Sequence, residues 1–372
     1  MVYKELCGER ISSLGMGTMR FPRVGGRGSE VSLEKTAEMI DYALKNGVNY
    51  FDTAWGYHGG KSEEIVGSIL SKYPRESFLL ATKFPGYSKE NHFKKEEIFE
   101  EQLRRCKVEY FDFYLFHNVS DSNIDFYLDP ELGLHAYLVK QKEAGRIKHL
   151  GFSSHGSYET VKKFLDAYGD TLEFCQLQIN WLDWSLQDAK SRVELLRERG
   201  IPVWVMEPVR GGKLVNLPET ASEKLASAAP DRSLAEWAFR YIQSLDGIGV
   251  TLSGMSNMPQ LEENVRIFSS ESALKPEELE LLYSVADSMK NCTPCTACSY
   301  CLSECPQKLD IPHLMGLYNE IVYTDGKHLP DALNEKGLLL PSECIACRSC
   351  EGVCPQEIKI SEVFMDFSER LK

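Results

Sequence analysis

Short apolar runs alternate with longer segments of helical periodicity over roughly the first 270 residues of the chain. The runs are continuously apolar, which is typical of strands buried on both faces. The segments between them carry apolar residues three and four positions apart, as amphipathic helices do. Strands are expected at 14–19, 49–52, 78–83, 111–117, 147–152, 173–179, 201–206 and 248–252, and helices at 33–45, 62–72, 94–107, 134–144, 158–167, 189–198, 234–243 and after Pro259.

Eight strands alternating with eight helices through short loops predict an α/β fold, a (β/α)8 TIM barrel. A doubly wound open sheet is the alternative, and it is weaker because no Gly-x-Gly-x-x-Gly motif follows the first strand. A small hairpin with its turn at Gly8 precedes the barrel, and one further helix begins near Pro276. The expected domains are a barrel over 1–274, a linking helix over 275–290 and a small cysteine-rich domain over 291–372.

Composition and net charge exclude several classes of function. Hydrophobic residues make up 43% of the chain and charged residues 26%, which is ordinary for a soluble protein. The net charge of −13 argues against nucleic-acid partners and against binding to an anionic membrane. No stretch approaches the roughly 18 apolar residues of a membrane helix. The first ten residues lack the apolar segment of a signal peptide, so we expect a cytoplasmic protein.

Polar side chains stand at the ends of three consecutive expected strands. Asp52 ends one strand and Tyr57 follows in a glycine-containing loop, before Ser62, which we expect to cap the next helix. Lys83 ends the following strand and His117 the one after it. Because the carboxyl ends of barrel strands face one pocket, Asp52, Tyr57, Lys83 and His117 are predicted to converge.

These four residue types suit proton transfer to a carbonyl oxygen. Asp52 pairing with Lys83 would keep the amine charged and oriented. An ammonium beside a phenol lowers the phenol's pKa from about 10, so that Tyr57 protonates a carbonyl near neutral pH. His117 would donate a hydrogen bond to the same oxygen. Each residue alone has an ordinary structural explanation, and their occurrence together indicates a catalytic site.

The residues around these positions carry a family resemblance. The motif Phe51-Asp52-Thr53-Ala54 with Tyr57, Gly60 and Ser62-Glu63, together with Ala81-Thr82-Lys83 and Tyr114-Leu115-Phe116-His117, resembles the aldo-keto reductases over roughly residues 1–270. The resemblance implies an oxidoreductase that reduces an aldehyde or ketone with NADP or NAD bound across the barrel mouth. It makes Tyr57 the general acid, with Lys83 and Asp52 supporting it and His117 orienting the carbonyl.

The resemblance also implies a set of nicotinamide-cofactor contacts. Ser154 stands where most members have Asn, and Met206 where many have an aromatic residue. Gly254 and Gln260 replace the Lys and Arg that many members use for the 2′-phosphate, so NADP and NAD both stay open. The implied cofactor residues are Gly17, Thr18, Ser153, Ser154, Gln176, Met206, Pro208, Val209, Arg210, Gly211, Ser253, Gly254, Met255, Ser256, Gln260, Glu263 and Asn264.

Cysteine is concentrated at the C-terminal end, where nine of the 12 lie between Cys292 and Cys354. Two runs share the spacing Cys-x-x-Cys-x-x-Cys-x-x-x-Cys-Pro of bacterial ferredoxins, in which the fourth cysteine ligates the other cluster. Zinc is the alternative, although zinc sites usually have Cys pairs with a long gap or include His. Cys292 is a spare thiol or an alternative ligand. The predicted 4Fe-4S ligands are Cys295, Cys298, Cys301 and Cys354 for one cluster and Cys344, Cys347, Cys350 and Cys305 for the other.

The whole chain is similar to the subgroup of aldo-keto reductases that bears a ferredoxin-like domain. This implies a small carbonyl substrate, two 4Fe-4S clusters and a redox partner protein as a further candidate. Nicotinamide passes two electrons and a cluster passes one, so direct exchange needs a mediator, and the sequence has no flavin signature. The alternative is an iron–sulfur electron-transfer protein whose barrel is a docking or sensor scaffold. Candidate substrate-pocket residues are Trp55, His58, Phe84, Asn118 and Trp181.

Overall fold

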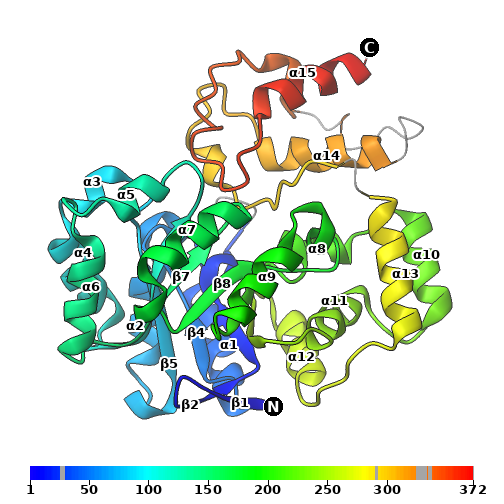
Figure 1. The fold of residues 1–372 in the computed structure, drawn as a ribbon. Helices are drawn as coiled ribbons and strands as arrows, with labels where there is room; N and C mark the ends of the chain where they lie inside the picture. The colour runs from blue at the N-terminus through cyan, green and yellow to red at the C-terminus, as the bar shows by residue number, and fades with distance from the viewer. Residues whose placement is uncertain (26–29, 290–291, 324–332, 334–336, 372) are drawn as a thin grey trace. The chain divides into compact units, whose positions relative to one another are not determined.

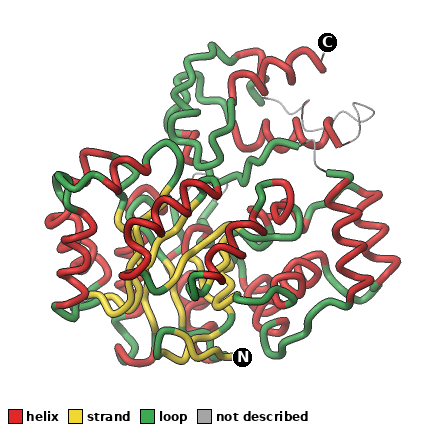
Figure 2. The backbone as a smooth tube through the Cα atoms, viewed as in Figure 1, coloured by secondary structure: helices red, strands yellow, loops and turns green. Residues whose placement is uncertain are grey.

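The computed structural model describes residues 1–25, 30–289, 292–323, 333 and 337–371 (Figures 1 and 2). The chain forms two compact units, which we call the barrel unit and the cysteine unit. The barrel unit contains Met1–Ile179, Asp188–Pro208 and Phe239–Ala273. The cysteine unit contains Asn180–Gln187, Val209–Ala238 and Leu274–Lys372, so it includes two segments from within the region predicted as barrel.

Eight parallel strands close into a barrel in the order β10-β3-β4-β5-β6-β7-β8-β9. The (β/α)8 prediction is therefore confirmed, and the open doubly wound sheet is excluded because the sheet has no edge. Every predicted strand has a counterpart in the chain. The strands are β3 (Leu14–Gly17), β4 (Tyr50–Asp52), β5 (Leu79–Phe84), β6 (Phe111–Val119), β7 (Ile147–Ser154), β8 (Phe174–Gln178), β9 (Val203–Met206) and β10 (Ile248–Ser253).

Helices connect successive strands of the barrel unit (Figure 1). Two short helices, α3 (Lys89–His92) and α5 (Ile124–Leu128), lie outside the predicted ranges because four or five residues are too few to show a helical period. The longer helices occupy the predicted segments. They are α1 (Leu33–Lys45), α2 (Ser62–Leu70), α4 (Lys95–Cys106), α6 (Leu134–Glu143), α7 (Tyr158–Tyr168), α9 (Ala189–Glu198), α11 (Leu234–Gln243), which spans both units, and α12 (Met258–Ile267).

The N-terminal hairpin of β1 (Tyr3–Leu6) and β2 (Glu9–Ser12) turns through Cys7 and Gly8, as predicted. Leu6 and Cys7 pack against a buried apolar cluster that includes Tyr50, Leu79 and Phe174. Those three residues begin β4, β5 and β8, so the cluster lies toward the N-terminal ends of the strands. The hairpin therefore covers the end of the barrel opposite to the strand ends that carry Asp52, Lys83 and His117.

The cysteine unit is helical and has its own core. Its helices are α8 (Asp183–Leu186), α10 (Glu219–Ala228), α13 (Pro276–Asp287), α14 (Ile311–Tyr323) and α15 (Ile360–Arg370). The predicted linking helix ends three residues early at Asp287, and Lys290 lies outside the described residues. Cys295, Cys301 and Cys350 are buried among the apolar residues of α14 and α15. The core of this unit is therefore built around its cysteines.

Several 3-10 turns connect these elements: Thr18–Arg20, η2 (Tyr57–Gly60), Arg75–Ser77, Gly169–Thr171, η5 (Arg210–Val215), Tyr300–Leu302 and Pro341–Glu343. The prediction that Ser62 caps α2 is wrong. Lys61 holds the cap position, and Ser62 is the first helical residue. The Ser62 hydroxyl instead accepts a hydrogen bond from Thr53 at 3.0 Å and lies 2.9 Å from the Thr18 hydroxyl. Within the described residues, no helix is long and apolar enough to cross a membrane.

Candidate functional site

A buried ion pair joins the ends of two neighbouring strands. Lys83 near the end of β5 places its Nζ 2.5 Å from Asp52 Oδ1 at the end of β4 and donates to the Thr53 carbonyl at 2.8 Å. Lys83 is 1% exposed and Asp52 is 3% exposed. Burial lowers the pKa of Lys83 from its ordinary value, and the Asp52 carboxylate opposes that shift. The pair fixes the amine in a position that two strands determine.

Tyr57 lies against this pair. The Lys83 Nζ is 5.2 Å from the centroid of the Tyr57 ring, and the His117 ring is 6.2 Å from it in an edge-to-face arrangement. The loop that carries Tyr57 turns through His58 and Gly59, both with positive φ, so Gly59 suits this position. The structure therefore brings together the four side chains predicted from the strand ends, all of them within the barrel unit.

His117 is held neutral. It is 8% exposed in β6, and burial followed by the charge of Lys83 lowers its pKa well below the usual value. The Tyr127 hydroxyl donates to the His117 carbonyl, and the Tyr87 ring lies 5.5 Å from the imidazole. Among the residues that the structure describes, Nδ1 of His117 has no hydrogen-bond partner. A neutral imidazole offers one donor and one acceptor, which suits contact with a carbonyl oxygen.

A buried polar network behind Lys83 was not predicted. Glu63 is fully buried, and its Oε1 accepts hydrogen bonds from Thr82 and Gln102, both at 2.7 Å. Gln102 also donates to the Lys83 carbonyl at 3.0 Å. A signal for it exists in the sequence, since Gln102 follows Ile98 and Phe99 by four and three positions and so stands on the apolar face of α4.

The residues predicted to contact nicotinamide lie at the ends of adjacent strands. Ser153 pairs in register with Gln176, and the Gln176 amide donates to the Met206 sulfur at 3.6 Å. Ser153 Oγ accepts from the Asn118 backbone at 2.8 Å. Ser154 Oγ, in contrast, donates to the Val119 carbonyl at 2.7 Å and is fully buried. Gln176 Oε1 is buried and has no hydrogen-bond partner in the described part of the chain.

The adenosine-side residues form a second group in the barrel unit. Ser253 Oγ accepts from Asn264 at 3.0 Å, and the Ser256 backbone donates to Gln260 at 2.8 Å. Gly254 lies beside Arg20, whose side-chain carbons are 3.3 Å from the place a Cβ would take. Arg20 is a cation that the sequence interpretation missed. The other predicted contacts in this unit are Gly17 at the end of β3, Thr18 after it, Pro208 after β9, Met255 after β10 and Glu263 in α12.

The remaining predicted cofactor residues, Val209, Arg210 and Gly211, fall in the cysteine unit. Arg210 is fully buried, with Nε 3.1 Å from Asp183 Oδ2 and Nη1 3.6 Å from the Cys292 sulfur. The predicted contact between Arg210 and a pyrophosphate stays a prediction. These partners all lie within the cysteine unit and engage two of the guanidinium nitrogens.

The eight ferredoxin-type cysteines line two cavities, grouped as predicted. Each cavity has about 340 Å³ of empty volume, counting space open to solvent. One is lined by Cys295, Cys298, Cys301 and Cys354, and we call it the 295 cavity. The other is lined by Cys305, Cys344, Cys347 and Cys350, and we call it the 344 cavity.

The backbone is bent in the same way around both cavities. Positive φ angles at residues other than glycine recur at equivalent positions, each 49 residues after its counterpart, as Cys344 is after Cys295. Such angles are uncommon and mark an imposed conformation. The matched pairs are Ala297 and Ala346, Ser299 and Arg348, and Lys308 and Glu357.

The sulfur spacing distinguishes a cluster from a single ion. Four thiolates around one zinc at 2.3 Å lie about 3.8 Å apart. Among the residues that the structure describes, no three of these sulfurs lie within 4.8 Å of one another. Burial, and then neighbouring cysteines of the same cavity, raise the pKa of Cys301. The donor set therefore fits a larger cationic core better than one zinc ion.

Two buried cations stand near the 295 cavity. Lys213 in η5 has a buried Nζ with no hydrogen-bond partner within the described residues. Burial lowers the pKa of Lys213, and the charges of Cys295 and Cys292 oppose that shift. Cys292, which is 7% exposed, lines neither cavity and instead contacts Arg210.

The candidate substrate-pocket residues are also divided between the barrel unit and the cysteine unit. Trp55 stacks under Arg105 at 3.8 Å, and His58 Nε2 lies 2.8 Å from the Thr18 carbonyl. Phe84 is fully buried in β5, and Asn118 has a positive φ in β6. Trp181 belongs to the cysteine unit and is 1% exposed. Their role in substrate binding remains a prediction.

Comparisons with known proteins find matches both to the barrel region and to the cysteine-rich region. Residues 13–287 match the profile of the aldo/keto reductase family, and residues 294–358 match that of a 4Fe-4S dicluster domain. The "Probable aldo-keto reductase 1" of Glycine max is 31% identical over 231 residues, which cover 58% of this chain. That match spans 63% of the relative's length, less than two thirds.

A second relative and a solved structure are matched over more of their length. The "Uncharacterized oxidoreductase YqkF" of Bacillus subtilis is 26% identical over 306 residues, which cover 74% of this chain and 92% of that protein. The aldo-keto reductase AKR11C1 from Bacillus halodurans, in its holo form, superposes with a TM-score of 0.63 at 26% identity. It covers 77% of this chain and 96% of its own.

Proposed function

Because the chain belongs to the aldo/keto reductase family and carries a 4Fe-4S dicluster domain, we propose that it reduces an aldehyde or ketone with a nicotinamide cofactor. The observation that carries the proposal is the convergence of Tyr57 with the buried Lys83–Asp52 pair and neutral His117. Reduction of a carbonyl adds a hydride to carbon and a proton to oxygen. The barrel site supplies the proton.

Each residue has a definable part in the proton transfer. The Tyr57 hydroxyl gives its proton to the carbonyl oxygen, and the Lys83 ammonium stabilises the phenolate that remains. Asp52 holds Lys83 in place through the 2.5 Å contact. Neutral His117 donates a hydrogen bond to the same oxygen and so orients the substrate. Burial of Asp52, Lys83 and His117 keeps water from these three side chains and strengthens their interactions.

The nicotinamide supplies the hydride when it is bound. Ser153 and Gln176 would hold its carboxamide, since they end adjacent strands and Gln176 Oε1 has no hydrogen-bond partner among the described residues. Arg20, Ser253 and Asn264 would face the adenosine side. Arg20 also offers a positive charge close to Gly254, where many family members carry their own cation, and so supports binding of a phosphorylated ribose.

The cysteines would hold two 4Fe-4S clusters, which supply one-electron transfer. The 344 cavity has the most exposed of the eight cysteines, Cys347, and beside it Ile345 is 59% exposed. Cys295 and Cys301, in contrast, are at most 9% exposed. We therefore assign exchange with a redox partner protein to the 344 cavity, since electron transfer needs a short approach to the cluster.

The test is the Tyr57→Phe variant of the anaerobically purified full chain, assayed with NADH and NADPH against a panel of small aldehydes and ketones. We expect kcat to fall by about 10²–10⁴, the usual contribution of a general acid. The visible absorption of the clusters should stay unchanged. Wild-type protein that binds neither nicotinamide, or a Tyr57→Phe variant with full turnover, would contradict the proposal.

The engagement of Arg210 favours a second candidate, an electron-transfer protein whose barrel serves as a scaffold. Arg210, one of the predicted cofactor contacts, is buried against Asp183 and Cys292. The two candidates differ in nicotinamide binding. Calorimetric titration of the wild-type chain with NADPH and NADH separates them, because the scaffold candidate requires that neither binds while the clusters remain redox-active.

A further inference from the structure

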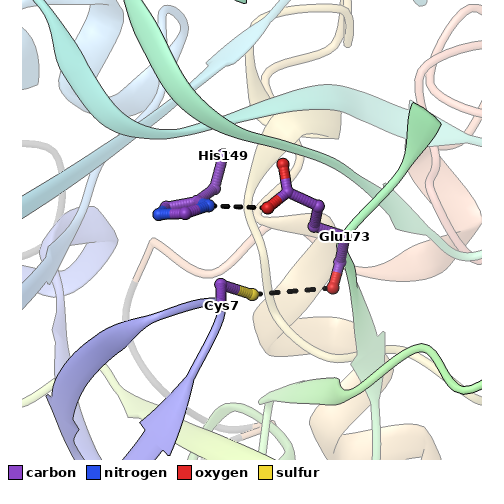
Figure 3. Close-up of side chains that lie close together, drawn as sticks. All are labelled: Cys7, His149 and Glu173. Atoms are coloured by element: carbon purple, nitrogen blue, oxygen red, sulfur yellow. Dashed lines mark hydrogen bonds and ion pairs between the residues drawn. The ribbon is translucent and has the colours of Figure 1, made fainter.

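Three metal-ligating side chains meet at the end of the barrel unit opposite to Tyr57 (Figure 3). Cys7 comes from the turn of the N-terminal hairpin, His149 from β7, and Glu173 from the residue before β8. Their ligand atoms all lie within 4.8 Å of one another. Figure 3 shows the three side chains directed toward a common point, although 166 residues separate Cys7 from Glu173 in the chain.

The contacts within the cluster are short. His149 Nδ1 lies 2.7 Å from Glu173 Oε2, and the Cys7 thiol donates to the Glu173 carbonyl at 3.7 Å. On the other side of the imidazole, Nε2 lies 3.9 Å from Glu9 Oε1. Lys142 contacts the second oxygen of the Glu173 carboxylate. One imidazole nitrogen therefore faces the cluster, and the other faces a second carboxylate.

Cys7 occupies its position under strain. The loop between Leu6 and Glu9 has two residues, and both have positive φ, 54° at Cys7 and 77° at Gly8. A turn of this type prefers Asn or Asp before Gly, and a cysteine there is uncommon. Burial, and then the charge of Glu173, raise the pKa of Cys7 to about 12.

We propose that Cys7, His149 and Glu173 bind a zinc ion, with water as the fourth ligand. Sulfur, imidazole nitrogen and carboxylate oxygen are the ligand types that zinc takes in proteins, whereas magnesium and calcium require oxygen. Tetrahedral zinc separates such ligands by about 3.3–3.8 Å. Small side-chain movements would therefore bring the three ligand atoms to the spacing that zinc requires. Glu9 then accepts from His149 Nε2–H, the outer carboxylate that commonly orients a metal-bound histidine.

Binding exchanges protons for the metal. The Cys7 S–H bond breaks as the Zn–S bond forms, and the proton leaves to solvent. Nδ1 of His149, which donates to Glu173 before the metal binds, gives its proton to solvent and coordinates zinc, while Nε2 carries the proton of the neutral imidazole. Lys142 must move away from the Glu173 carboxylate, so its ammonium competes with zinc. Bound zinc would connect the hairpin to β7 and β8 and clamp the covered end of the barrel.

Zinc in one of the ferredoxin cavities is the main confounding source, and coordination chemistry separates it. The anaerobically purified full chain, with both clusters in place, is treated with EDTA and dialysed against chelator-buffered zinc. Zinc per chain is then measured by mass spectrometry and its ligands by X-ray absorption. We expect one zinc per chain with one sulfur and three nitrogen or oxygen neighbours. No retained zinc, or a shell of four sulfurs, overturns the proposal.

Variants define the ligands. Cys7→Ser and His149→Gln should each lose the bound zinc, whereas the matched control Cys106→Ser, a buried barrel cysteine away from the cluster, should retain it. Glu9→Gln should weaken zinc affinity by about 10- to 100-fold, as loss of an outer-shell partner does. Equal zinc content in Cys7→Ser and wild type overturns the assignment.

Lys142→Met distinguishes a metal site from an ion-pair network. Removal of the competing ammonium should tighten zinc binding, by about tenfold or more if the Lys142–Glu173 contact is as strong as a buried charged hydrogen bond. Zinc should also raise the melting temperature of the wild type and of Lys142→Met but not of Cys7→Ser. A melting temperature that zinc leaves unchanged in every protein contradicts the proposal even if some zinc is retained.

Discussion

The barrel site and the two cysteine cavities differ in what holds their side chains in place. Asp52, Lys83 and His117 are fixed by neighbouring strands and by direct contacts such as the 2.5 Å ion pair. The cysteines line cavities of about 340 Å³, and their sulfurs are too far apart for a single ion. Direct contacts between side chains therefore hold the first site, whereas the cysteines of the second surround two cavities that a cluster would fill.

The two cores show the same difference. The barrel cluster consists of hydrocarbon and aromatic side chains such as Phe113 and Trp204, which pack without any added group. The core of the cysteine unit includes Cys295, Cys301 and Cys350 beside the apolar faces of α14 and α15. Burial of apolar area stabilises both cores, and in the second a bound cluster would add its binding free energy to folding.

Removal of a cluster is therefore expected to have the largest effect. Cys301→Ser should abolish the cluster of the 295 cavity and expose α14 and α15 to proteases, while the barrel stays folded. Limited proteolysis followed by mass spectrometry measures both regions in one sample. In the matched control Cys292→Ser, the protein should keep eight iron atoms per chain, two clusters of four. If the C-terminal domain resists proteases without iron, then it does not depend on its clusters for stability, and the proposed difference from the barrel is wrong.

Removal of Lys83 should affect catalysis and also lower stability, because it leaves the buried Asp52 carboxylate without its partner. In Lys83→Met the apolar stem fills the same space, but the phenolate of Tyr57 loses its neighbouring ammonium. We expect kcat to fall by about 10²–10³, as for the loss of one charge-stabilising group, and the alkaline limb of the pH–rate profile to move to higher pH. Iron content and cluster absorption should remain at the wild-type level. Unchanged kinetics would show that the buried pair has a structural role alone.

The positions of the strand-end residues could be predicted because the alternation of strands and helices determines where each strand ends. The ferredoxin-type spacing of the two cysteine runs, in turn, predicted which four cysteines share a cavity. The partners of those residues could not be predicted. Gln102 and Glu63 form a buried network only after α4 and α2 pack beside β5, and Tyr127 reaches the His117 carbonyl only after α5 packs beside β6. Such polar contacts depend on tertiary geometry, which the periodicity of one segment does not contain.

Two errors have the same physical origin. Ser62 has the residue type of a helix cap, but its hydroxyl bonds to side chains that arrive from β3 and β4. The Cys7–His149–Glu173 cluster escaped notice because the hairpin and two strands meet only in the folded barrel. In each case, the contacts of the side chain are determined by residues that are distant in sequence, and the local segment alone does not show them.

A pH-dependent prediction tests how firmly the strands hold His117. Its lowered pKa means that the unfolded state binds a proton below about pH 6.5 while the folded state does not. Stability therefore falls as pH decreases from about 6.5, by at most about 1.4 kcal/mol per pH unit for this one group.

In His117→Gln that contribution disappears, so the loss of stability between pH 7 and pH 5 should be smaller than in the wild type. Denaturant unfolding of both proteins at pH 7 and at pH 5 measures this change in the free energy of unfolding. The other buried histidines remain in both proteins and cancel in the comparison. An identical pH dependence in the two proteins would mean that His117 is protonated in the folded barrel as readily as in water.

The smallest expected effect concerns the two cavities themselves. Lys213 places a buried ammonium near Cys295, whereas Lys308 beside the 344 cavity is exposed to solvent. Reduction of a cluster adds negative charge, so a buried cation favours the reduced form. At an effective dielectric constant of about 20 and a separation of about 10 Å, one charge contributes about 1.7 kcal/mol, or about 70 mV for one electron.

Lys213→Met should therefore lower the reduction potential of one cluster by several tens of millivolts and leave iron content unchanged. Lys308→Met, the matched control, should shift neither potential measurably, because solvent screens its charge. Redox titration monitored by electron paramagnetic resonance resolves the two clusters. Equal shifts in both variants would show that burial does not distinguish the two cavities. A shift confined to Lys213→Met would show that the buried ammonium raises the potential of one cluster above the value it would otherwise have.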